Sequence, residues 1–257
     1  MVYITKHLLL LVLVMTRLST LLMTMPAIGT GVPKRIRAML AVLLTFLIAP
    51  SVIAIDPDYS PQALSNVDLA ILLALEGAIG LFIGSVVQFL VTGVQLGGEI
   101  MTGTGGMQLG DSIDPTTSST MPTLAKLIGM LVVAVMIAIG GHRMLLSSLI
   151  ESFHAMPPGR VELHESMLAM LTSQLGTSLA AGVKVSAPVV VAMLLCNLIT
   201  GLISRTLPQI NVLAIGLSIN SLALLAVAAF SIGSAAYVFQ DAFLVTIDQL
   251  SDLWAIE

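Results

Sequence analysis

Six ionisable side chains lie within or at the edge of long apolar stretches, and they are the residues best placed to do chemistry in this sequence. They are Arg17, Glu76, Glu99, Lys126, Lys184 and Arg205. A charge at the centre of a lipid bilayer costs at least about 2.5 to 3.5 kcal/mol on insertion scales. Each of the six therefore needs a charged partner, water, or a route to the membrane surface.

These charges have three possible interpretations. Glu76 and Lys184 could form a proton or ion relay, as in a secondary transporter. Alternatively, the charges form salt bridges between helices that fix the assembly of subunits. Lys126 and Arg205 could also extend their long side chains to a membrane interface. We favour structural pairing, because no second carboxylate accompanies Glu76 within its own predicted helix, residues 69–92.

Motifs of enzymes and metal sites are missing from the sequence. His154 and His164 do not stand at metal-ligand spacing on one helix face, and neither H-E-x-x-H nor G-x-S-x-G occurs. The glycines near 103–110 lack the Lys-Ser/Thr pair of a phosphate-binding loop. Asp111 and Asp114 lie close together, but they make no convincing pair for an intramembrane protease. We expect no enzyme, no metal and no cofactor.

The amino-acid composition indicates that this chain is surrounded by lipid or by other apolar helices. Of its 257 residues, 57% are hydrophobic and only 9% charged, which excludes a water-facing soluble domain. The net charge is −4, and no basic run is longer than the cluster at residues 34–37. The sequence therefore excludes a basic surface for binding nucleic acid. No stretch between the apolar segments is long enough to hold a soluble core, so we predict one membrane domain over residues 1–257.

The apolar stretches predict an all-α, polytopic membrane protein. Windows of about 20 residues, enough to cross the hydrocarbon core, fall near 8–28, 36–55, 69–92, 124–140, 179–203 and 212–240. Proline and glycine separate them, at Pro26, Pro50 and Pro208 for example. We therefore expect six long helices and no strand. Residues 235–257 could be an interfacial helix or a partner-binding tail.

A glycine-rich region at about 93–120 does not fit a plain helical bundle. It contains Gly93, Gly97, Gly98, Gly103, Gly105, Gly106 and Gly110, followed by Asp114-Pro115. We expect broken helix and loop here. Irregular backbone at membrane depth is tolerated only where it is buried in protein or lines a water-filled cavity. A pore or plug is the favoured interpretation, and an ordinary loop outside the membrane is the alternative because the region carries acidic residues.

A helical hairpin is predicted at about 140–179. A short helix follows Gly141, and Pro157-Pro158-Gly159 turns the chain. The returning arm, Val161–Leu175, is too polar on one face for lipid, so we expect it to pack on protein or headgroups.

Glycines recur at helical spacing, as in Gly80 with Gly84 and Gly93 with Gly97. Such pairs let helix backbones approach closely where lipid removes the hydrophobic drive for association. They predict tight packing between helices.

The order of these landmarks resembles the FliR/SctT export-gate family of type III secretion, over about residues 12–232. The matching elements are Arg17-Leu18-Ser19, Met25-Pro26, Gly31 to Arg37, Gly98-Glu99, Asp114-Pro115, Gly141-His142, Ser152-Phe153, Pro157, Gly159, Pro188, Asn197, Gly201, Pro208-Gln209-Ile210-Asn211-Val212 and Gly216. The segment Pro208-Gln209-Ile210-Asn211 is the strongest single element. No piece is diagnostic alone, but their order and spacing together are specific.

This resemblance implies a pore-forming subunit without chemistry of its own. It would join FliP-like and FliQ-like gate subunits in a closed helical assembly in the bacterial inner membrane, at the flagellar basal body. The assembly would pass unfolded flagellar proteins outward and work with an FlhB-like switch protein. Alternatives are an export-gate subunit of a related injectisome, or a small-solute or ion secondary transporter. A transporter would usually show an internal repeat with paired interrupted helices, and only one glycine-broken region is found.

The resemblance also implies a plug that occludes the resting pore. Its residues would be Gly103, Gly105, Gly106, Met107, Leu109, Gly110, Asp114 and Pro115. Relatives often carry a bulky aromatic residue among these glycines, whereas this chain has Met107 and Leu109. A methionine is apolar and flexible, so we hypothesise that Met107 seals the pore while yielding to a passing chain.

Overall fold

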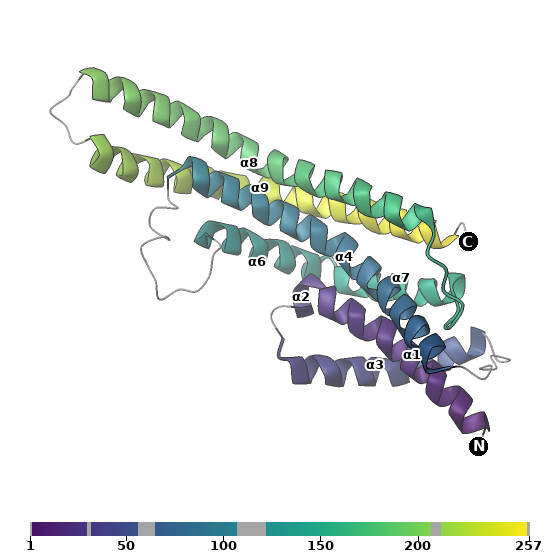
Figure 1. The fold of residues 1–257 in the computed structure, drawn as a ribbon. Helices are drawn as coiled ribbons and strands as arrows, with labels where there is room; N and C mark the ends of the chain where they lie inside the picture. Colours follow the sequence, from purple (N-terminus) through teal and green to yellow (C-terminus); the bar gives the residue numbers. More distant parts are fainter. Residues whose placement is uncertain (1, 30–31, 56–64, 107–121, 207–211, 256–257) are drawn as a thin grey trace. The chain divides into compact units, whose positions relative to one another are not determined.

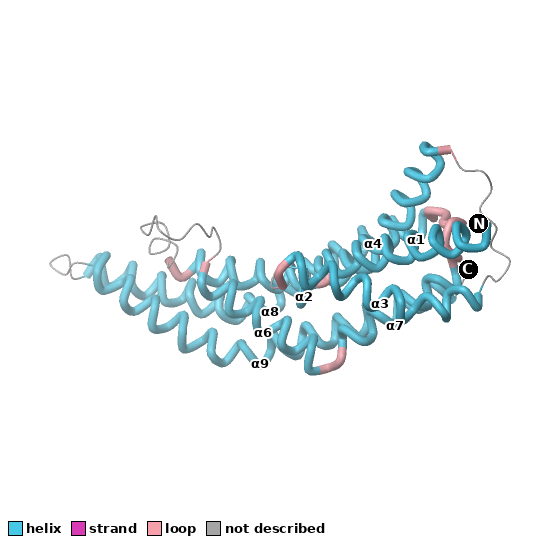
Figure 2. The backbone as a smooth tube through the Cα atoms, turned by 90° about the horizontal axis from the view of Figure 1, so that it is seen from below, coloured by secondary structure: helices cyan, strands magenta, loops and turns pink. Residues whose placement is uncertain are grey.

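The computed structural model describes residues 2–29, 32–55, 65–106, 122–206 and 212–255 (Figure 1). Its helices are α1 (Val2–Thr24), α2 (Pro26–Gly29), α3 (Lys34–Ile55), α4 (Asn66–Thr104), α6 (Thr123–Ala138), α7 (Gly141–Ala155), α8 (Glu165–Thr206) and α9 (Val212–Ala255). Figure 2 shows helices joined by short loops, and no strand occurs in these ranges. The prediction of an all-α fold is confirmed.

Four of the described helices are long and apolar enough to cross a membrane: α3, α4, α8, and α9 from Ser218 onward. The pair α6 and α7 forms a fifth, broken candidate, interrupted at Gly140, whose φ of 77° is left-handed. The apolar part of α1, Leu8–Thr24, is shorter. Four of the six predicted apolar windows lie within one helix, whereas the window 8–28 crosses the break at Met25 between α1 and α2, and the window 124–140 runs two residues past the end of α6. Fewer than six of the described helices have the length of a full span.

The helix α4 corrects the prediction of a broken helix from residue 93. It runs unbroken for 39 residues through Gly93, Gly97 and Gly98 and ends only at Thr104. The chain leaves the helix at Gly105 and Gly106, the latter with a φ of 74° that favours glycine. The earlier glycines stay helical because other helices pack against them, as described below for the second unit.

The two long C-terminal helices also extend beyond the predicted limits. The chain turns at Pro157-Pro158-Gly159, where Gly159 has a φ of 81°. The returning arm begins at Glu165 and does not end near residue 179, because α8 continues for 42 residues to Thr206. The segment after residue 235 likewise continues α9 as far as Ala255.

The chain divides into two compact units. Unit 1 comprises residues 1–89, 137–174 and 243–257, and unit 2 comprises residues 90–136 and 175–242. The helices α4, α8 and α9 each contribute to both units. The prediction of a single membrane domain stays a prediction.

Unit 1 has an aliphatic core, and side chains of α9 make hydrogen bonds and a ring contact with other helices of the unit. Its fully buried side chains include Leu13, Leu18, Leu21, Ile79, Ile83, Leu145 and Leu149. The indole N–H of Trp254 in α9 donates to Ser148 Oγ in α7 at 2.8 Å, and its ring meets Phe82 of α4 edge-on. Gln174 Nε2 of α8 donates to Thr246 Oγ1 of α9 at 2.9 Å. These contacts fix the end of α9 on this unit.

Unit 2 is built on a close contact between α4 and α8. A Cβ atom on Gly93 would collide with the Ser178 carbonyl, and one on Gly182 would collide with the Gly93 carbonyl. One turn further along both helices, a Cβ on Gly97 would lie 2.6 Å from the Gly182 carbonyl oxygen. The contact therefore advances along both helices together, so this pair is parallel, and it leaves no space for any side chain larger than glycine.

Two further helices complete unit 2. On another side of α4, a Cβ on Gly98 would lie 2.8 Å from Ala125 Cα in α6. Asn197 and Thr200 of α8 lie against Asn220 and Gly216 of α9. Because later residues of α8 meet earlier residues of α9, these two helices are antiparallel.

Candidate functional site

A fully buried ion pair lies within unit 1. Arg17 Nε of α1 donates to Glu76 Oε2 of α4 at 2.7 Å. Both side chains are 0% exposed. An ion pair removed from water is tolerated only when the remaining donors and acceptors are also satisfied, so the surrounding contacts decide what this pair does.

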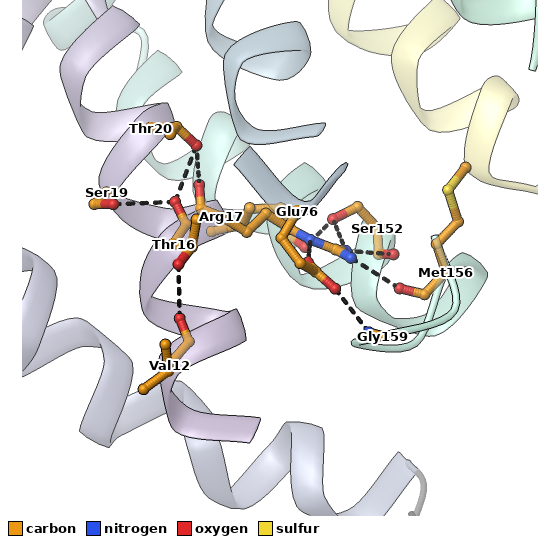
Figure 3. A network of polar contacts seen from close by, with 10 residues as sticks. Val12, Thr16, Arg17, Ser19, Thr20, Glu76, Ser152, Met156 and Gly159 are labelled. Atoms are coloured by element: carbon orange, nitrogen blue, oxygen red, sulfur yellow. Dashed lines mark hydrogen bonds and ion pairs between the residues drawn. The ribbon is translucent and has the colours of Figure 1, made fainter. Parts of the chain in front are cut away.

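The arginine and the glutamate each have further partners in the same unit. Arg17 Nη1 donates to the carbonyl and hydroxyl oxygens of Ser152, at 3.0 and 3.1 Å, and Nη2 donates to the Met156 carbonyl at 3.1 Å. Glu76 Oε1 accepts the Gly159 N–H at 2.8 Å. The guanidinium also lies 4.3 Å from the centre of the Phe153 ring. Figure 3 shows the arginine pointing from α1 toward Glu76, Ser152 and Met156.

Local structure explains why these partners are available. The last carbonyls of a helix have no partner within the helix and carry partial negative charge. Ser152 lies in the last turn of α7 and Met156 caps it. The guanidinium therefore gives the Met156 carbonyl a donor and adds a second donor to the Ser152 carbonyl, which already accepts the Met156 N–H at 2.9 Å. At Gly159 the positive φ turns the chain, and the N–H of this turn meets the carboxylate.

Glycine brings the two charged helices together. A Cβ atom on Gly80 of α4 would collide with the Arg17 carbonyl and with Thr20 Oγ1. One turn later, a Cβ on Gly84 would collide with Thr24 Oγ1. The glycine spacing noted in the sequence therefore lets α1 lie against α4, which places Arg17 within reach of Glu76.

The arrangement has the character of a permanent structural tie. Both Glu76 oxygens accept hydrogen bonds, and all three guanidinium nitrogens donate. One pair of charges thus joins α1, α4, the end of α7 and the turn before α8. A proton relay would need a path along which the carboxylate exchanges its proton, whereas this carboxylate is 0% exposed and held by two donors.

A smaller polar chain lies in unit 2, where α4 ends. Asn197 Nδ2 of α8 lies 3.4 Å from the Thr104 carbonyl oxygen, and Asn220 Nδ2 of α9 donates to Asn197 Oδ1 at 2.6 Å. Next to Thr104, a Cβ on Gly105 would lie 2.8 Å from Leu224 Cδ2 of α9. Two side-chain amides and one leucine therefore position the last residues of α4, from which the glycine-rich region continues.

The remaining predicted site residues are placed as follows. Glu99 is half-buried, and Gly103, Lys184 and Arg205 are exposed; Gly105 is buried and Gly106 half-buried. Met107, Leu109, Gly110, Asp114, Pro115, Pro208, Gln209 and Asn211 lie outside the described residues. Of the six charges singled out in the sequence, the structure brings Arg17 and Glu76 together, and the partners that it shows for Glu76 are Arg17 and Gly159.

Sequence reasoning missed several partners of these residues. Ser152 and Gly159 appeared only as landmarks, and the Met156 carbonyl gave no signal because any residue type supplies one. Asn220 could have been noticed as a polar side chain in an apolar helix, the same signal that singled out the charges. In the part of the chain that the structure describes, no cluster of three or more His, Cys, Asp or Glu residues could hold a metal ion.

Comparison with known proteins supplies the family context. Residues 8–245 match the family model "Bacterial export proteins, family 1". The flagellar biosynthetic protein FliR of Escherichia coli (strain K12) is 32% identical over 202 residues, covering 78% of this chain and 75% of that protein. FliR of Caulobacter vibrioides is 28% identical over 238 residues, covering 92% and 93%, and FliR of Bacillus subtilis (strain 168) is 24% identical over 248 residues, covering 95% and 94%.

Proposed function

Because the chain belongs to the bacterial export proteins, family 1, over residues 8–245, we propose that it is the pore-forming FliR-type subunit of a flagellar type III export gate. Membership of this family makes it a membrane protein of flagellar biosynthesis and a component of protein export rather than an enzyme. The family match over nearly the whole chain is the observation that carries the proposal. The flagellar role is favoured over an injectisome role because the relatives named above are flagellar proteins.

In this proposal the subunit lies in the bacterial inner membrane, in the flagellar basal body, and helps to pass unfolded flagellar proteins outward. Its partners are FliP-like and FliQ-like gate subunits and an FlhB-like switch protein. The exposed side chains of α8 and α9 support a partnered state. Leu198, Leu202, Leu222 and Phe230 are between 57% and 89% exposed, so these helices require lipid or other helices around them.

We further propose that the region from Gly103 to Pro115 is the plug of the resting gate. Support comes from its first residues, since the Thr104 carbonyl is held by Asn197 and the left-handed Gly106 follows immediately. The plug thus starts from a fixed helix end in unit 2. Met107 is proposed to close the pore as a flexible apolar side chain.

The Met107 proposal predicts an ion leak. Replacing Met107 with Gly removes the sealing side chain, so ion conductance through the assembled gate in a planar bilayer should rise several-fold at rest. The matched control is Met130→Gly, a change at a methionine of α6 that is 70% exposed and remote in sequence from the plug. Unchanged conductance for Met107→Gly would remove this residue from the seal.

The gate proposal is tested by purifying the tagged protein from its native host in mild detergent and identifying by mass spectrometry what elutes with it. FliP-like and FliQ-like subunits in one sharp peak are expected. If the chain elutes alone as a stable monomer or homodimer, the gate proposal fails and a transporter takes its place. Recovery of injectisome subunits instead of flagellar ones would support a gate subunit but assign it to an injectisome rather than to a flagellum.

A further inference from the structure

An apolar cavity lies inside unit 2. Its volume is about 280 Å³, and side chains of α4, α6, α8 and α9 line it. The described residues that line it all belong to unit 2. An apolar cavity of about 150 Å³ is large enough to bind a small apolar molecule such as benzene. This cavity is nearly twice as large, so an apolar ligand fits inside it.

The cavity follows from the side chains on two of its helices. On α6 the lining residues recur at one-turn spacing and are large: Leu124, Leu127, Ile128 and Leu131. On α9 the lining residues have the same spacing: Ala228, Ser231, Ile232 and Ala235. Three of the four side chains on α9 are small, so they do not fill the space that the larger side chains of α6 leave open.

Close contacts beside the cavity keep its walls in place. The glycine contact between α4 and α8 lies one turn before Met101 and Val185, which both line the cavity. The helix α6 is held against α4 at Ala125, and α9 is held against the end of α4 at Leu224, one turn before Ala228. The four helices therefore cannot move together to fill the cavity without losing these contacts.

Water does not suit this cavity. Ser231 is the polar residue among the described lining residues, and its hydroxyl already donates to the Val227 carbonyl at 3.1 Å. A buried water molecule needs two to four polar partners, and apolar cavities stay dry. An empty cavity would leave its lining without partner atoms and would forfeit their dispersion contacts. An apolar occupant restores these contacts.

The exposure of the lining residues locates the opening of the cavity. Leu127 of α6 and Ile232 of α9 are 57% and 46% exposed, whereas Met101 and Ile128 are 1% and 4% exposed. The cavity therefore opens between α6 and α9, and Met101 and Ile128 form its floor. Both helices belong to candidate membrane spans, and the family is one of membrane proteins. The medium at this opening is therefore lipid hydrocarbon.

We propose that the cavity of unit 2 binds one acyl chain of a membrane phospholipid, which enters between α6 and α9 and reaches Met101 and Ile128. The lipid completes the packing of four helices that their own side chains leave incomplete. The gain comes from dispersion contacts, because the acyl chain leaves an apolar medium and no hydrophobic drive is available. This lipid site does not depend on the proposed gate function.

The first test is photolabelling in the membrane. Phosphatidylethanolamine with a diazirine midway along one acyl chain is incorporated into inner-membrane vesicles of the native host and activated by light before any detergent is added. Label should appear on Met101 and Ile128, which only a chain inside the cavity can reach. The matched controls are Val94 of α4 and Val132 of α6, which are buried and do not line the cavity. Their labelling should be at least tenfold lower, and equal labelling of floor and controls would overturn the lipid site.

The second test fills the cavity. Ala228→Leu combined with Ala235→Leu adds side-chain atoms where the acyl chain would lie, so labelling of Met101 and Ile128 should fall at least fivefold. The matched control is Ala229→Leu, a change at the exposed next residue of α9, which should leave this labelling unchanged. Where the double variant does not accumulate, Ala228→Leu alone decides. Unchanged labelling of the floor in the filled variant would overturn the lipid site.

Thermal unfolding gives a readout that is independent of labelling. Adding dioleoylphosphatidylethanolamine to the lipid-depleted wild-type chain in detergent should raise its melting temperature by several degrees, because a ligand that binds the folded chain stabilises it. The melting temperature of the filled variant should not respond to this lipid. Equal responses of the two chains would contradict binding in the cavity.

Two other occupants would also overturn the lipid site. Floor labelling that occurs in the chain alone but disappears when gate subunits elute with it would assign the cavity to a side chain of a neighbouring subunit, and would leave the gate proposal intact. Floor labelling that appears only after detergent is added would show binding of an adventitious additive only. Failure of the wild-type chain to recover any gate subunit would overturn the gate proposal, whereas floor labelling in the membrane would still support the lipid site.

Discussion

The helix α4 is closely approached by α1 in unit 1 and by α8 in unit 2, and these two contacts use different chemistry. In unit 1 Gly80 lies against the Arg17 carbonyl, and in unit 2 Gly93 lies against the Ser178 carbonyl. The first approach also delivers a buried ion pair with Glu76, whereas the second has only backbone against backbone. Glycine lets the two helices approach closely in both contacts, but only the ion pair in unit 1 selects which residues of the two helices lie opposite one another. Losing a charge should therefore be more damaging than enlarging a glycine.

Breaking the ion pair should have the largest effect. Arg17→Ala leaves Glu76 buried without its counter-charge and removes the side-chain donors to the Ser152 and Met156 carbonyls, so we expect a loss of about 3 to 5 kcal/mol in the free energy of unfolding. Thermal unfolding of the purified chain or its complex in detergent measures this loss.

A paired replacement sharpens the same prediction. Arg17→Met combined with Glu76→Leu removes both charges and keeps apolar volume, so it should be less destabilising than Arg17→Ala alone. A double variant that is as unstable as the sum of the two single variants would show that the charges do not act as a pair.

Enlarging a glycine in unit 2 should have an intermediate effect. Gly182→Ala places a Cβ against the Gly93 carbonyl, which forces α4 and α8 apart, and about 1 to 3 kcal/mol of stability should be lost. The matched control is Gly176→Ala on the same helix, where nothing lies within 4 Å of the added atom. That control should raise stability by up to about 1 kcal/mol, because alanine is the better helix former. Equal effects of the two changes would contradict the close contact.

The amide chain at the end of α4 should give the smallest effect. Asn220→Leu removes the donor to Asn197 and should cost about 0.5 to 1.5 kcal/mol. Because the two amides act in series on Thr104, adding Asn197→Leu should produce less than the sum of the single losses in a double-mutant cycle. Strictly additive losses of stability would show that Asn220 does not act on the end of α4 through Asn197.

The same comparison shows what the sequence could predict. Charge in an apolar stretch singled out Arg17 and Glu76, but not their mutual pairing, because 59 residues separate them and no local pattern encodes a contact between distant helices. Glycine spacing predicted close helix packing, which Gly80 and Gly93 provide. The same glycines also led to the wrong prediction that the helix breaks from residue 93, since a glycine marks either a break or a close contact and only the packing partner decides between them.

Helix lengths were harder to predict than helix positions. Each apolar window of the sequence overlaps a helix, but the window that began at residue 179 and the window that ended at residue 240 made α8 and α9 shorter than they are. Gln174 is buried and donates a hydrogen bond to Thr246 of α9. This polar residue therefore joins two continuous helices and does not mark the end of one.

The most direct test of the gate function is export itself. In the native host, deletion of the gene for this chain should stop the appearance of flagellar proteins in the culture medium while their synthesis in the cytoplasm continues. Restoring the wild-type chain should restore export, whereas Arg17→Ala should not. Flagellar proteins that still reach the medium in the deletion strain at the wild-type rate would contradict the account.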